Sequence, residues 1–442
     1  MRKSMFALSS VMIASLVLSA CGGGNESGSP QPSGAAPSSD VKLNFWLQSY
    51  GDRAQQAAAM DEITAGFKQE TGIEVSYDII DWNSANQKYS LAMNGGESPD
   101  VAEYFFLSSF AKMGGENFGP MQINDIAAEL DAENTYYPSA LNETKIGDDY
   151  YGLPWRMDTR IMIYRKDHFE ENGIEQAPKT WDELVETAEK LTVRNGDAIT
   201  RSGVGYFVTR GDFTQSAMAT MAQNDGAVLD FTDEKVTINE PNAVEALQFM
   251  QDLVKKHKVT SESLATPTTD SSTKFFTGEV SMLLGVNPDF LKTLEAQAPQ
   301  LLDKVGFAEL PSKSVTGNSS VLFAAPVSVF NSTKHPEEAK QFLKYFLRAD
   351  NQVKLMKATG LINANKEVMQ DEMYGTEWYA ALAAQAERAV NGDLPVPYWS
   401  TVSAFPDGPV SSMVSKVLFG NDVQAAADES AASIEKIVTA NQ

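Results

Sequence analysis

Side chains that could carry catalysis or hold a metal ion are few and widely spaced in this sequence. His168, His257 and His335 are the three histidines, and each is expected on the solvated surface. Cys21 is the single cysteine, which excludes a zinc site built from cysteine and histidine. The sequence contains no nucleophile elbow, phosphate-binding glycine loop, HExxH motif or calcium loop. We therefore expect no catalytic residue, no metal site and no cofactor.

Carboxylates are abundant, with 59 aspartates and glutamates in the chain. Two of them could form the acid pair of a glycoside hydrolase, in which one carboxyl protonates the leaving group and the other acts as base or nucleophile. The sequence singles out no such pair, so it leaves this enzyme class open as an alternative.

Cys21 has a chemistry of its own, set by the residues before it. Arg2 and Lys3 precede an uncharged run, residues 5–20, which serines interrupt and which is shorter than the about 20 apolar residues of a membrane-spanning helix. A cysteine after Leu18-Ser19-Ala20 resembles a bacterial lipobox, which implies cleavage before Cys21 and its acylation. Two or more acyl chains give stable anchoring. The alternative is an ordinary signal peptide with a chance cysteine.

The composition of the mature chain limits its partners. Residues 1–20 hold two of the 35 basic residues, so 33 basic residues then stand against 59 acidic ones, a formal charge of −26. Such a surface disfavours nucleic acid and anionic headgroups. Residues 21–39 are rich in Gly, Ser, Pro and Ala and are predicted to form a flexible tether. We expect a monomer outside the cytoplasm, attached to the cell membrane through lipid alone.

The elements that would position a binding site begin with a β-α-β unit. Alternating apolar residues predict one strand from Val41 to Phe45 and another from Ile73 to Ile79. Between them, apolar residues at helical spacing predict a helix from Arg53 to Glu70, which Gly72 ends. This order builds a parallel sheet with a right-handed crossover.

Strands and helices continue to alternate along the rest of the chain. Strands are predicted over residues 100–106, 160–165 and 280–286, and helices over 87–93, 180–191, 241–256 and 335–347. Thr180 and Glu183 form a predicted capping box, in which Glu183 reaches back to the amide of Thr180. The pattern indicates an α/β protein, and the length favours two domains.

Short motifs follow one another through these elements in a fixed order. They include Thr71-Gly-Ile-Glu-Val, Gly96-Glu-Ser-Pro-Asp-Val, Tyr151-Gly-Leu-Pro-Trp, Pro178-Lys-Thr-Trp-Asp-Glu-Leu, Phe276-Thr-Gly-Glu-Val, Gly306-Phe-Ala-Glu-Leu-Pro and Thr359-Gly-Leu-Ile-Asn. Each is weak alone, but their shared order resembles the family 1 extracellular solute-binding proteins. These are the sugar receptors of ABC importers, of which maltose-binding protein is the best known. The resemblance covers nearly all of residues 41–442.

The resemblance implies an α/β, two-lobed periplasmic-binding-protein type II fold, with a ligand cleft between the lobes and a hinge that closes on ligand. By analogy, lobe 1 comprises residues 40–154 and 322–370, and lobe 2 comprises residues 155–321 and 371–442. The implied function is capture of a mono- or oligosaccharide by lobe closure and its delivery to the permease subunits of an ABC importer.

A sugar receptor needs two kinds of side chain. Charged groups bond the hydroxyls at about 1.5–3 kcal/mol each, and flat aromatic rings cover the C–H faces. Both are expected in loops after strand ends, at the lobe interface. The expected ligand contacts of lobe 1 are Gln48, Tyr50, Asp52, Trp82 and Tyr104. The expected contacts at the hinge and in lobe 2 are Trp155, Arg156, Asp158, Asn287, Trp399 and Phe405.

Structural roles are the alternatives for several of these residues. Trp46 could belong to the core and Asp52 could cap the helix that follows. Arg156 and Asp158 could form an ion pair between the lobes, and Trp399 could pack a proline-rich loop onto its lobe. Two alternative functions also stay open, a receptor for a non-sugar solute such as a polyamine or polyol and a surface-anchored glycoside hydrolase.

Overall fold

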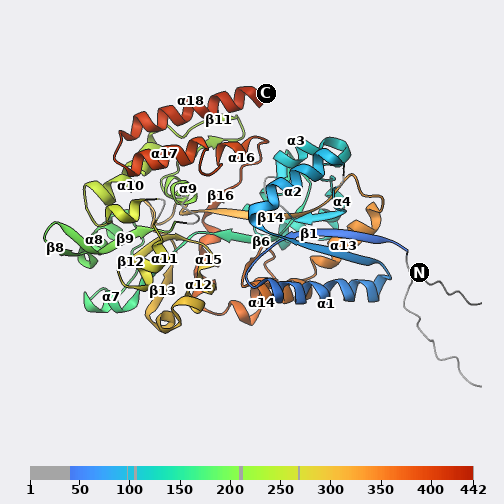
Figure 1. Ribbon diagram of the computed structural model, residues 1–442, viewed down its shortest axis with the longest axis horizontal. Coiled ribbons are helices and arrows are strands. Elements are labelled where there is room, and N and C mark those ends of the chain that lie inside the picture. The colour runs from blue at the N-terminus through green and yellow to red at the C-terminus, as the bar shows by residue number, and fades with distance from the viewer. Residues whose placement is uncertain (1–39, 97, 104–106, 209–212, 267–268, 442) are drawn as a thin grey trace, which may run out of the picture. The chain divides into compact units, whose positions relative to one another are not determined.

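The computed structural model describes residues 40–96, 98–103, 107–208, 213–266 and 269–441 (Figure 1). The predicted signal peptide and tether, with Cys21, lie outside the described residues, as does the expected ligand contact Tyr104. No helix in the described ranges is long and apolar enough to cross a membrane. In these same ranges, no group of three or more histidine, cysteine, aspartate or glutamate side chains is placed to hold a metal ion.

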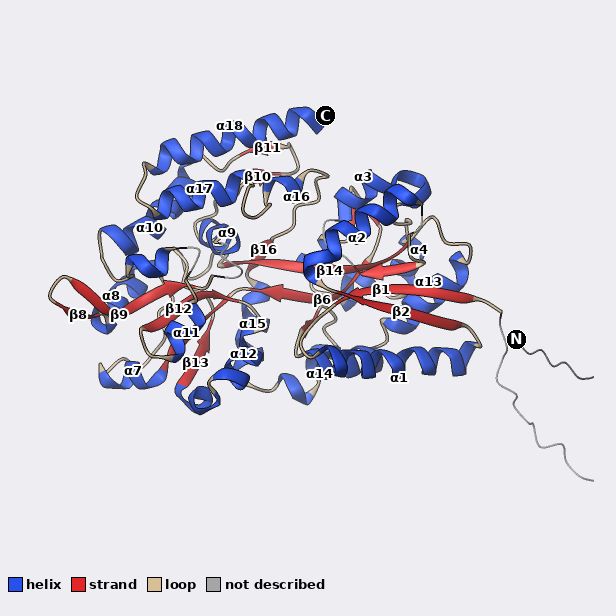
Figure 2. Ribbon diagram, in the orientation of Figure 1, coloured by secondary structure: helices blue, strands red, loops and turns tan. Residues whose placement is uncertain are grey.

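Seven strands form the first sheet (Figure 2). They are β1 (Lys42–Gln48), β2 (Glu74–Ile80), β3 (Val101–Glu103), β6 (Leu153–Thr159), β14 (Ser320–Val329), β15 (Ile362–Asn363) and β16 (Ala389–Asn391). Their order is β15-β6-β14-β3-β1-β2, with β16 beside β14. Strand β1 is parallel to β2 and β3, whereas β14 is antiparallel to β3 and β6. The carboxyl ends of β1 and β3 therefore lie side by side.

Helix α1 (Arg53–Thr71) connects β1 to β2, which confirms the predicted β-α-β unit. The Asp52 carboxylate caps it by accepting two backbone N–H groups of the first turn, at 2.8 and 3.0 Å. Gly72 ends it in the left-handed conformation, with φ of 80°, and donates its N–H to the carbonyl of Lys68. Both ends of the helix are thus fixed by local sequence.

Aromatic rings hold helix α13 (Pro336–Phe346) against the same sheet. Phe45 of β1 lies edge-on to Phe342 and Phe346, with ring centroids 5.4 and 5.0 Å apart. Phe67 of α1 contacts Phe342 with centroids 5.2 Å apart. The helix predicted over residues 335–347 is confirmed, and it buries an apolar stripe that includes Ala339, Phe342, Leu343 and Phe346.

Five strands form the second sheet. They are β7 (Ile161–Arg165), β8 (Val193–Asn195), β9 (Ala198–Tyr206), β12 (Val280–Val286) and β13 (Val305–Ala308), in the order β13-β7-β12-β9-β8. Strand β12 is parallel to β9 and antiparallel to β7. Every residue of β12 is buried, as its unbroken apolar run predicts.

The chain passes from the first sheet to the second at a single residue, Arg160, which separates β6 from β7. It returns through residues 309–319, between β13 and β14. Helix α15 (Glu377–Glu387) then contacts strands of both sheets. These changes of sheet do not coincide with the predicted lobe boundaries, which stay predictions.

The remaining elements surround the two sheets. Helices α14 and α1 lie on one side of the first sheet, and α2 and α3 lie on the other (Figure 1). In chain order the remaining elements are α2 (Trp82–Gly95), α3 (Leu107–Phe118), α4 (Asn124–Glu129), α5 (Ala132–Thr135), α6 (Pro138–Asn142), β4 (Lys145–Ile146), β5 (Asp149–Tyr150), α7 (Lys166–Glu171), α8 (Trp181–Leu191), α9 (Thr214–Ala222), β10 (Leu229–Asp230), β11 (Lys235–Val236), α10 (Pro241–Lys255), η1 (Glu262–Ala265), α11 (Ser271–Phe276), α12 (Phe290–Gln297), η2 (Pro299–Lys304), α14 (Ala349–Thr359), η3 (Val368–Gln370), η4 (Glu372–Tyr374), α16 (Trp399–Val402), α17 (Pro409–Leu418) and α18 (Val423–Asn441).

The capping box of α8 differs from the predicted one in a single contact. Thr180 Oγ1 accepts the N–H of Glu183 at 3.2 Å, as predicted. The Glu183 carboxylate accepts the N–H of Lys179 at 2.7 Å rather than that of Thr180. Thr180 is extended and forms a β-bridge with Ser312, and this course of the chain presents the amide of the preceding residue to Glu183.

Close packing of α8 on β9 depends on Gly203, and a Gly203→Ala variant tests it. A Cβ at this position would lie 2.0 Å from the carbonyl oxygen of Ala188, which cannot move without bending the helix. We expect the free energy of unfolding to fall by about 1–3 kcal/mol in urea titrations. Gly95→Ala is the matched control, since a Cβ there would meet nothing within 4 Å. Equal losses in both variants would contradict the packing argument.

Candidate functional site

A fully buried carboxylate, that of Glu103, organises polar groups from β6 and from the carboxyl ends of β1 and β3. Its oxygens accept the N–H of Gln48 at 3.1 Å and the hydroxyl of Tyr50. Arg156 lies beside it, with Nε 3.7 Å from Oε1 of Glu103. The structure therefore brings together three predicted ligand contacts, Gln48, Tyr50 and Arg156, around an acid that the sequence analysis did not select.

Burial makes the charges of this cluster depend on one another. Burial raises the pKa of Glu103, although the Arg156 charge and the Tyr50 hydrogen bond oppose the rise. Burial alone would lower the pKa of Arg156, but Tyr50, Glu103 and Asp158 raise it above its ordinary value. Burial also raises the pKa of Tyr50, so its hydroxyl stays a donor at neutral pH.

Strand β6 places its predicted contacts on two opposite faces, because successive side chains of a strand alternate. Arg156 and Asp158 share one face. Trp155 points to the other, where it is fully buried beside the rings of Tyr50 and Phe346, with centroids 5.8 and 5.9 Å away. Ligand contact by Trp155 stays a prediction, and in the described structure its side chain has no exposed surface.

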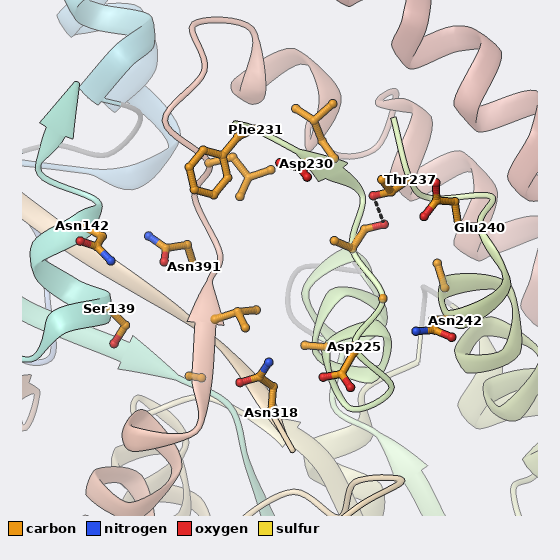
Figure 3. A pocket seen from close by; sticks show the side chains of 18 of the residues that line it. Ser139, Asn142, Asp225, Asp230, Phe231, Thr237, Glu240, Asn242, Asn318 and Asn391 are labelled. Carbon is orange, nitrogen blue, oxygen red and sulfur yellow. Dashed lines mark hydrogen bonds between the residues drawn. The ribbon is translucent and has the colours of Figure 1, made fainter. Parts of the chain in front are cut away.

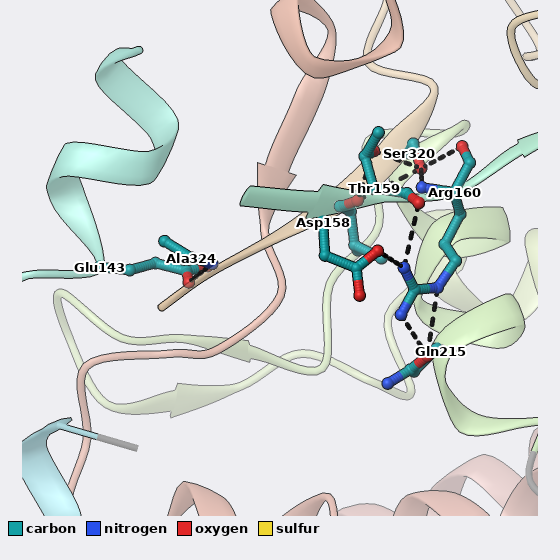
Figure 4. Close-up of polar contacts among 8 residues, drawn as sticks. Glu143, Asp158, Thr159, Arg160, Gln215, Ser320 and Ala324 are labelled. Atoms are coloured by element: carbon teal, nitrogen blue, oxygen red, sulfur yellow. Dashed lines mark hydrogen bonds and ion pairs between the residues drawn. The ribbon is translucent and has the colours of Figure 1, made fainter. Parts of the chain in front are cut away.

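Asp158 forms an ion pair with Arg160, a partner that the sequence analysis did not consider (Figure 4). The Arg160 guanidinium also donates to Gln215 Oε1 of α9, with Nε at 3.1 Å, and lies over the ring of Phe323, with Cζ 5.0 Å from its centroid. The Asp158 side chain keeps 21% of its surface exposed. Asp158 is therefore held in place and still accessible.

Trp82 is predicted in a polar loop, and that placement is wrong. It is the first residue of α2 and is half-buried. Its Nε1 donates to the carbonyl of Ser49 at 2.9 Å, and its ring lies edge-on to Tyr50 at 5.5 Å. The polar residues around it suggested a loop because the same residue types favour the first turn of a helix. Trp82 nevertheless adjoins the Glu103 cluster.

Two of the structural alternatives are confirmed on this side of the molecule. Asp52 caps α1, and it remains exposed, so its contact with ligand stays a prediction. Trp46 is buried against Tyr89, with ring centroids 5.5 Å apart, on the face of β1 opposite to Phe45.

The ligand contacts predicted for lobe 2 differ in how exposed their side chains are. Asn287 follows β12, and its buried Oδ1 has no hydrogen-bond partner among the residues that the structure describes. Trp399 is buried, and its Nε1 donates to the carbonyl of Gly392 at 3.1 Å, which matches the packing alternative. Phe405 is 43% exposed. Of the three, Asn287 offers an acceptor and Phe405 an open ring, and contact with ligand stays a prediction for all of them.

Two carboxyls that the sequence analysis did not select, those of Glu143 and Asp393, lie near the Glu103 cluster. Glu143 follows α6, and its Oε2 accepts the N–H of Ala324 in β14 at 2.5 Å (Figure 4). Its Oε1 accepts the N–H groups of Gly392 and Asp393, at 3.1 and 3.3 Å. These contacts tie α6 to β14 and to the segment after β16. No local pattern marks them, because the partners are 181 to 250 residues away.

Glu143 and Asp393 form a coupled acid pair. Burial raises the pKa of Glu143 well above its ordinary value, and the charge of Asp393 raises it further. Burial raises the pKa of Asp393 to about 7, although a hydrogen bond with Trp399 and the charges of Arg156 and Arg160 oppose the rise. Adjacent buried carboxyls titrate as a unit, so we expect the pair to hold a proton near neutral pH.

The histidines do not belong to this site. His168 is buried, with Nδ1 3.0 Å from Ser281 Oγ, so its expected place on the solvated surface is wrong. Its ring packs between α7 and β12, and this burial lowers its pKa to about 4. His257 lies 3.6 Å from the Glu189 carboxylate at the surface.

Comparisons with known proteins assign this arrangement to a family. The model of the bacterial extracellular solute-binding protein family matches residues 50–353, more than half of the chain. The chain therefore belongs to the bacterial extracellular solute-binding proteins. This solute-binding protein is 25% identical to the diacetylchitobiose binding protein DasA of Streptomyces coelicolor over 437 residues, 97% of each chain.

Solved structures share its fold. The sugar-binding protein MalE of Xanthomonas citri gives a TM-score of 0.78 at 20% identity, over 90% of this chain and 98% of that one. A cyclo/maltodextrin-binding protein complexed with maltotetraose gives a TM-score of 0.74 at 20% identity, over 92% and 100%. The solute-binding protein thus has the two-lobed α/β fold of the MalE-type periplasmic binding proteins, as predicted.

The acid pair gives this solute-binding protein a specific pH dependence, which Asp393→Asn tests. The pKa of Asp393 rises from 3.8 to about 7 on folding, so its protonated form stabilises the fold. That stabilisation is complete below pH 3.8 and is lost as the pH rises through about 7. When the pH is raised from about 5 to about 8, the free energy of unfolding should fall in the parent. We expect this fall to be about 1–3 kcal/mol smaller in the variant.

The control for this measurement is the exposed Asp148→Asn, which removes a carboxylate away from the pair. Denaturant titrations at both pH values supply the free energies. If Asp393→Asn and the parent lose the same amount, the pair does not hold the proton.

Proposed function

We propose that this solute-binding protein captures a neutral mono- or oligosaccharide and delivers it to the permease subunits of an ABC importer. The observation that carries the proposal is the similarity to a diacetylchitobiose binding protein, which spans 97% of both chains. Similarity over the whole length includes both lobes and the segments between them, and a closing receptor uses all of these.

The chemistry of the Glu103 cluster supports a neutral ligand. Each charge in it already has a partner, Glu103 with Arg156 and Asp158 with Arg160. A sugar hydroxyl both donates and accepts, so it can bond to Asp158 without adding a charge to be compensated. Trp82 and Tyr50 place aromatic rings beside the same groups.

The proposed mechanism is closure of two lobes, residues 40–154 with 322–370 and residues 155–321 with 371–442, on the sugar. Arg156 and Asp158 stand at the start of the second lobe, and Arg156 lies beside Glu103 and Tyr50 of the first. A ligand bonded there would meet groups of both lobes, with Asn287 proposed as a further contact of the second. The sugar then stabilises the closed form by its greater affinity for it. We propose the predicted contacts, Tyr104 and Phe405 included, as the first set to test.

We also propose that the protein does no chemistry on its ligand. The family and the similar structures are binding proteins, which supports this view. A surface-anchored glycoside hydrolase would instead release new reducing ends from oligosaccharides. A reducing-end assay on chitin and maltodextrin oligomers separates the two, because a receptor binds stoichiometrically and forms no product.

Sugar capture is tested first by thermal unfolding against mono- and oligosaccharides, with polyamines and polyols as the competing ligand classes. A ligand bound only by the folded state raises Tm by mass action. We expect a sugar to raise it and spermidine not to do so. A Tm shift by polyamines alone would refute the carbohydrate proposal.

The site is tested with the sugar so identified in Asp158→Ala and Asn287→Ala. Each variant removes a hydrogen-bonding group, and we expect the affinity measured by calorimetry to fall about tenfold or more, or about 1.4 kcal/mol. Asp407→Ala, at an exposed acid of the loop near Phe405, is the control. Unchanged affinity in both test variants would remove β6 and the end of β12 from the site. Trp155→Ala is less informative, because Trp155 is buried and its loss would disturb the core.

We propose that acylation of Cys21 tethers the protein to the extracytoplasmic face of the cell membrane, after cleavage of residues 1–20. We expect Cys21→Ser to move the full-length protein from the detergent phase to the aqueous phase of a Triton X-114 partition, with loss of acyl mass. The control is Ser27→Ala in the tether, which should stay in the detergent phase. Detergent partition of Cys21→Ser would contradict the lipid anchor.

A further inference from the structure

A cavity of about 880 Å³ lies apart from the Glu103 cluster, between α6 and the segment that joins α9 to α10 (Figure 3). Strand β16 and the chain before β14 line it as well. Its volume falls within the range of about 300–1,000 Å³ typical of small-molecule sites. It shares no lining residue with the predicted ligand contacts.

Four side-chain amides contribute to the polar lining of this cavity. They belong to Asn142, Asn242, Asn318 and Asn391, from four separate segments of the chain. Asn142, Asn318 and Asn391 follow one wall in Figure 3, and Asp225 lies opposite. An amide offers a donor and an acceptor together, which matches a hydroxyl pair on a sugar ring.

The charges that line the cavity exclude an anion. Asp225, Asp230, Glu240 and Glu387 contribute carboxylates, and the lining contains no lysine or arginine. Glu240 already pairs with Lys235, and Asp230 accepts the N–H of Thr232 at 3.0 Å. Part of the acidic charge is therefore already compensated by groups of the protein, so binding of a cationic ligand is not needed to neutralise it.

Aromatic and apolar groups complete the lining. Phe231, in the turn between β10 and β11, is 43% exposed and lies over one end of the cavity (Figure 3). Tyr137, Pro138 and Val390 add further apolar surface. An exposed ring beside side-chain amides is suited to cover the C–H face of a sugar.

We propose that this cavity is a second site, which binds a neutral carbohydrate segment through the asparagine amides and Phe231. The cavity adjoins the Glu143–Asp393 pair, because Asn391 precedes Gly392, whose N–H group donates to Glu143. Its occupant would therefore lie close to the segment that carries Asp393.

The single cysteine makes this proposal testable by thiol protection. In a full-length Cys21→Ser chain, Ser139→Cys places one thiol in the cavity lining at a half-buried position and leaves the asparagine amides and Phe231 intact. Its alkylation by iodoacetamide is followed with diacetylchitobiose or maltotetraose, and with spermidine, at millimolar concentration. We expect a neutral sugar to slow alkylation about tenfold once it exceeds its Kd by that factor.

Two further variants separate this cavity from the cleft. Ala227→Trp fills the cavity at an exposed lining position and should abolish protection. Asp158→Ala, in the cleft, should leave protection intact even where it weakens cleft binding. Phe419→Cys, a thiol at a 60% exposed position away from the cavity lining, should not be protected.

The opposite pattern overturns the proposal. If neither sugar slows alkylation of Ser139→Cys, or if spermidine alone does so, no carbohydrate binds there. If Asp158→Ala removes protection while Ala227→Trp retains it, the effect comes from the cleft, and the second site is refuted without harm to the proposed receptor function.

Discussion

A carboxylate with no exposed surface costs several kcal/mol unless partners compensate it, and Glu103 is such a group. Its compensation comes from the backbone of Gln48, the hydroxyl of Tyr50 and the guanidinium of Arg156. These partners stand on or just after two strands of the first sheet, β1 and β6, and Glu103 ends a third, β3, so their positions follow from strand order. These hydrogen bonds and the ion pair therefore hold the side chains of the Glu103 cluster in place on the first sheet.

A second buried carboxylate, that of Glu143, holds neighbouring segments of the chain together through hydrogen bonds to their backbone. It accepts three backbone N–H groups, from β14 and from the segment after β16, so it joins stretches of the chain that lie far apart in the sequence. Asp393, adjacent to it, faces the charges of Arg156 and Arg160. The two acidic centres are thus linked through Arg156 of β6 and Arg160, the residue that follows the strand. A change of protonation at one centre alters the electrostatic field at the other.

Local sequence was enough for much of the fold and for part of the site. The caps of α1, the strand β12 and the buried stripe of α13 follow from short-range patterns. The period of a strand would also have separated Trp155 from Arg156, had residues 153–159 been recognised as one strand rather than as a hinge segment. Glu143 could not be found in this way, because its role depends on residues that folding brings from the far end of the chain.

Charge compensation bears on the kind of ligand that the cleft can accept. Arg156 and Arg160 are balanced by Glu103 and Asp158, and the Glu143–Asp393 pair is expected to hold a proton near neutral pH. A ligand with a full charge would have to displace one of these partners or remain uncompensated in a low-dielectric site. A neutral polyhydroxylated ligand requires neither, since it exchanges hydrogen bonds with groups that keep their own partners. The same reasoning applies to the amide-lined cavity, whose acids are partly engaged and whose lining has no basic residue.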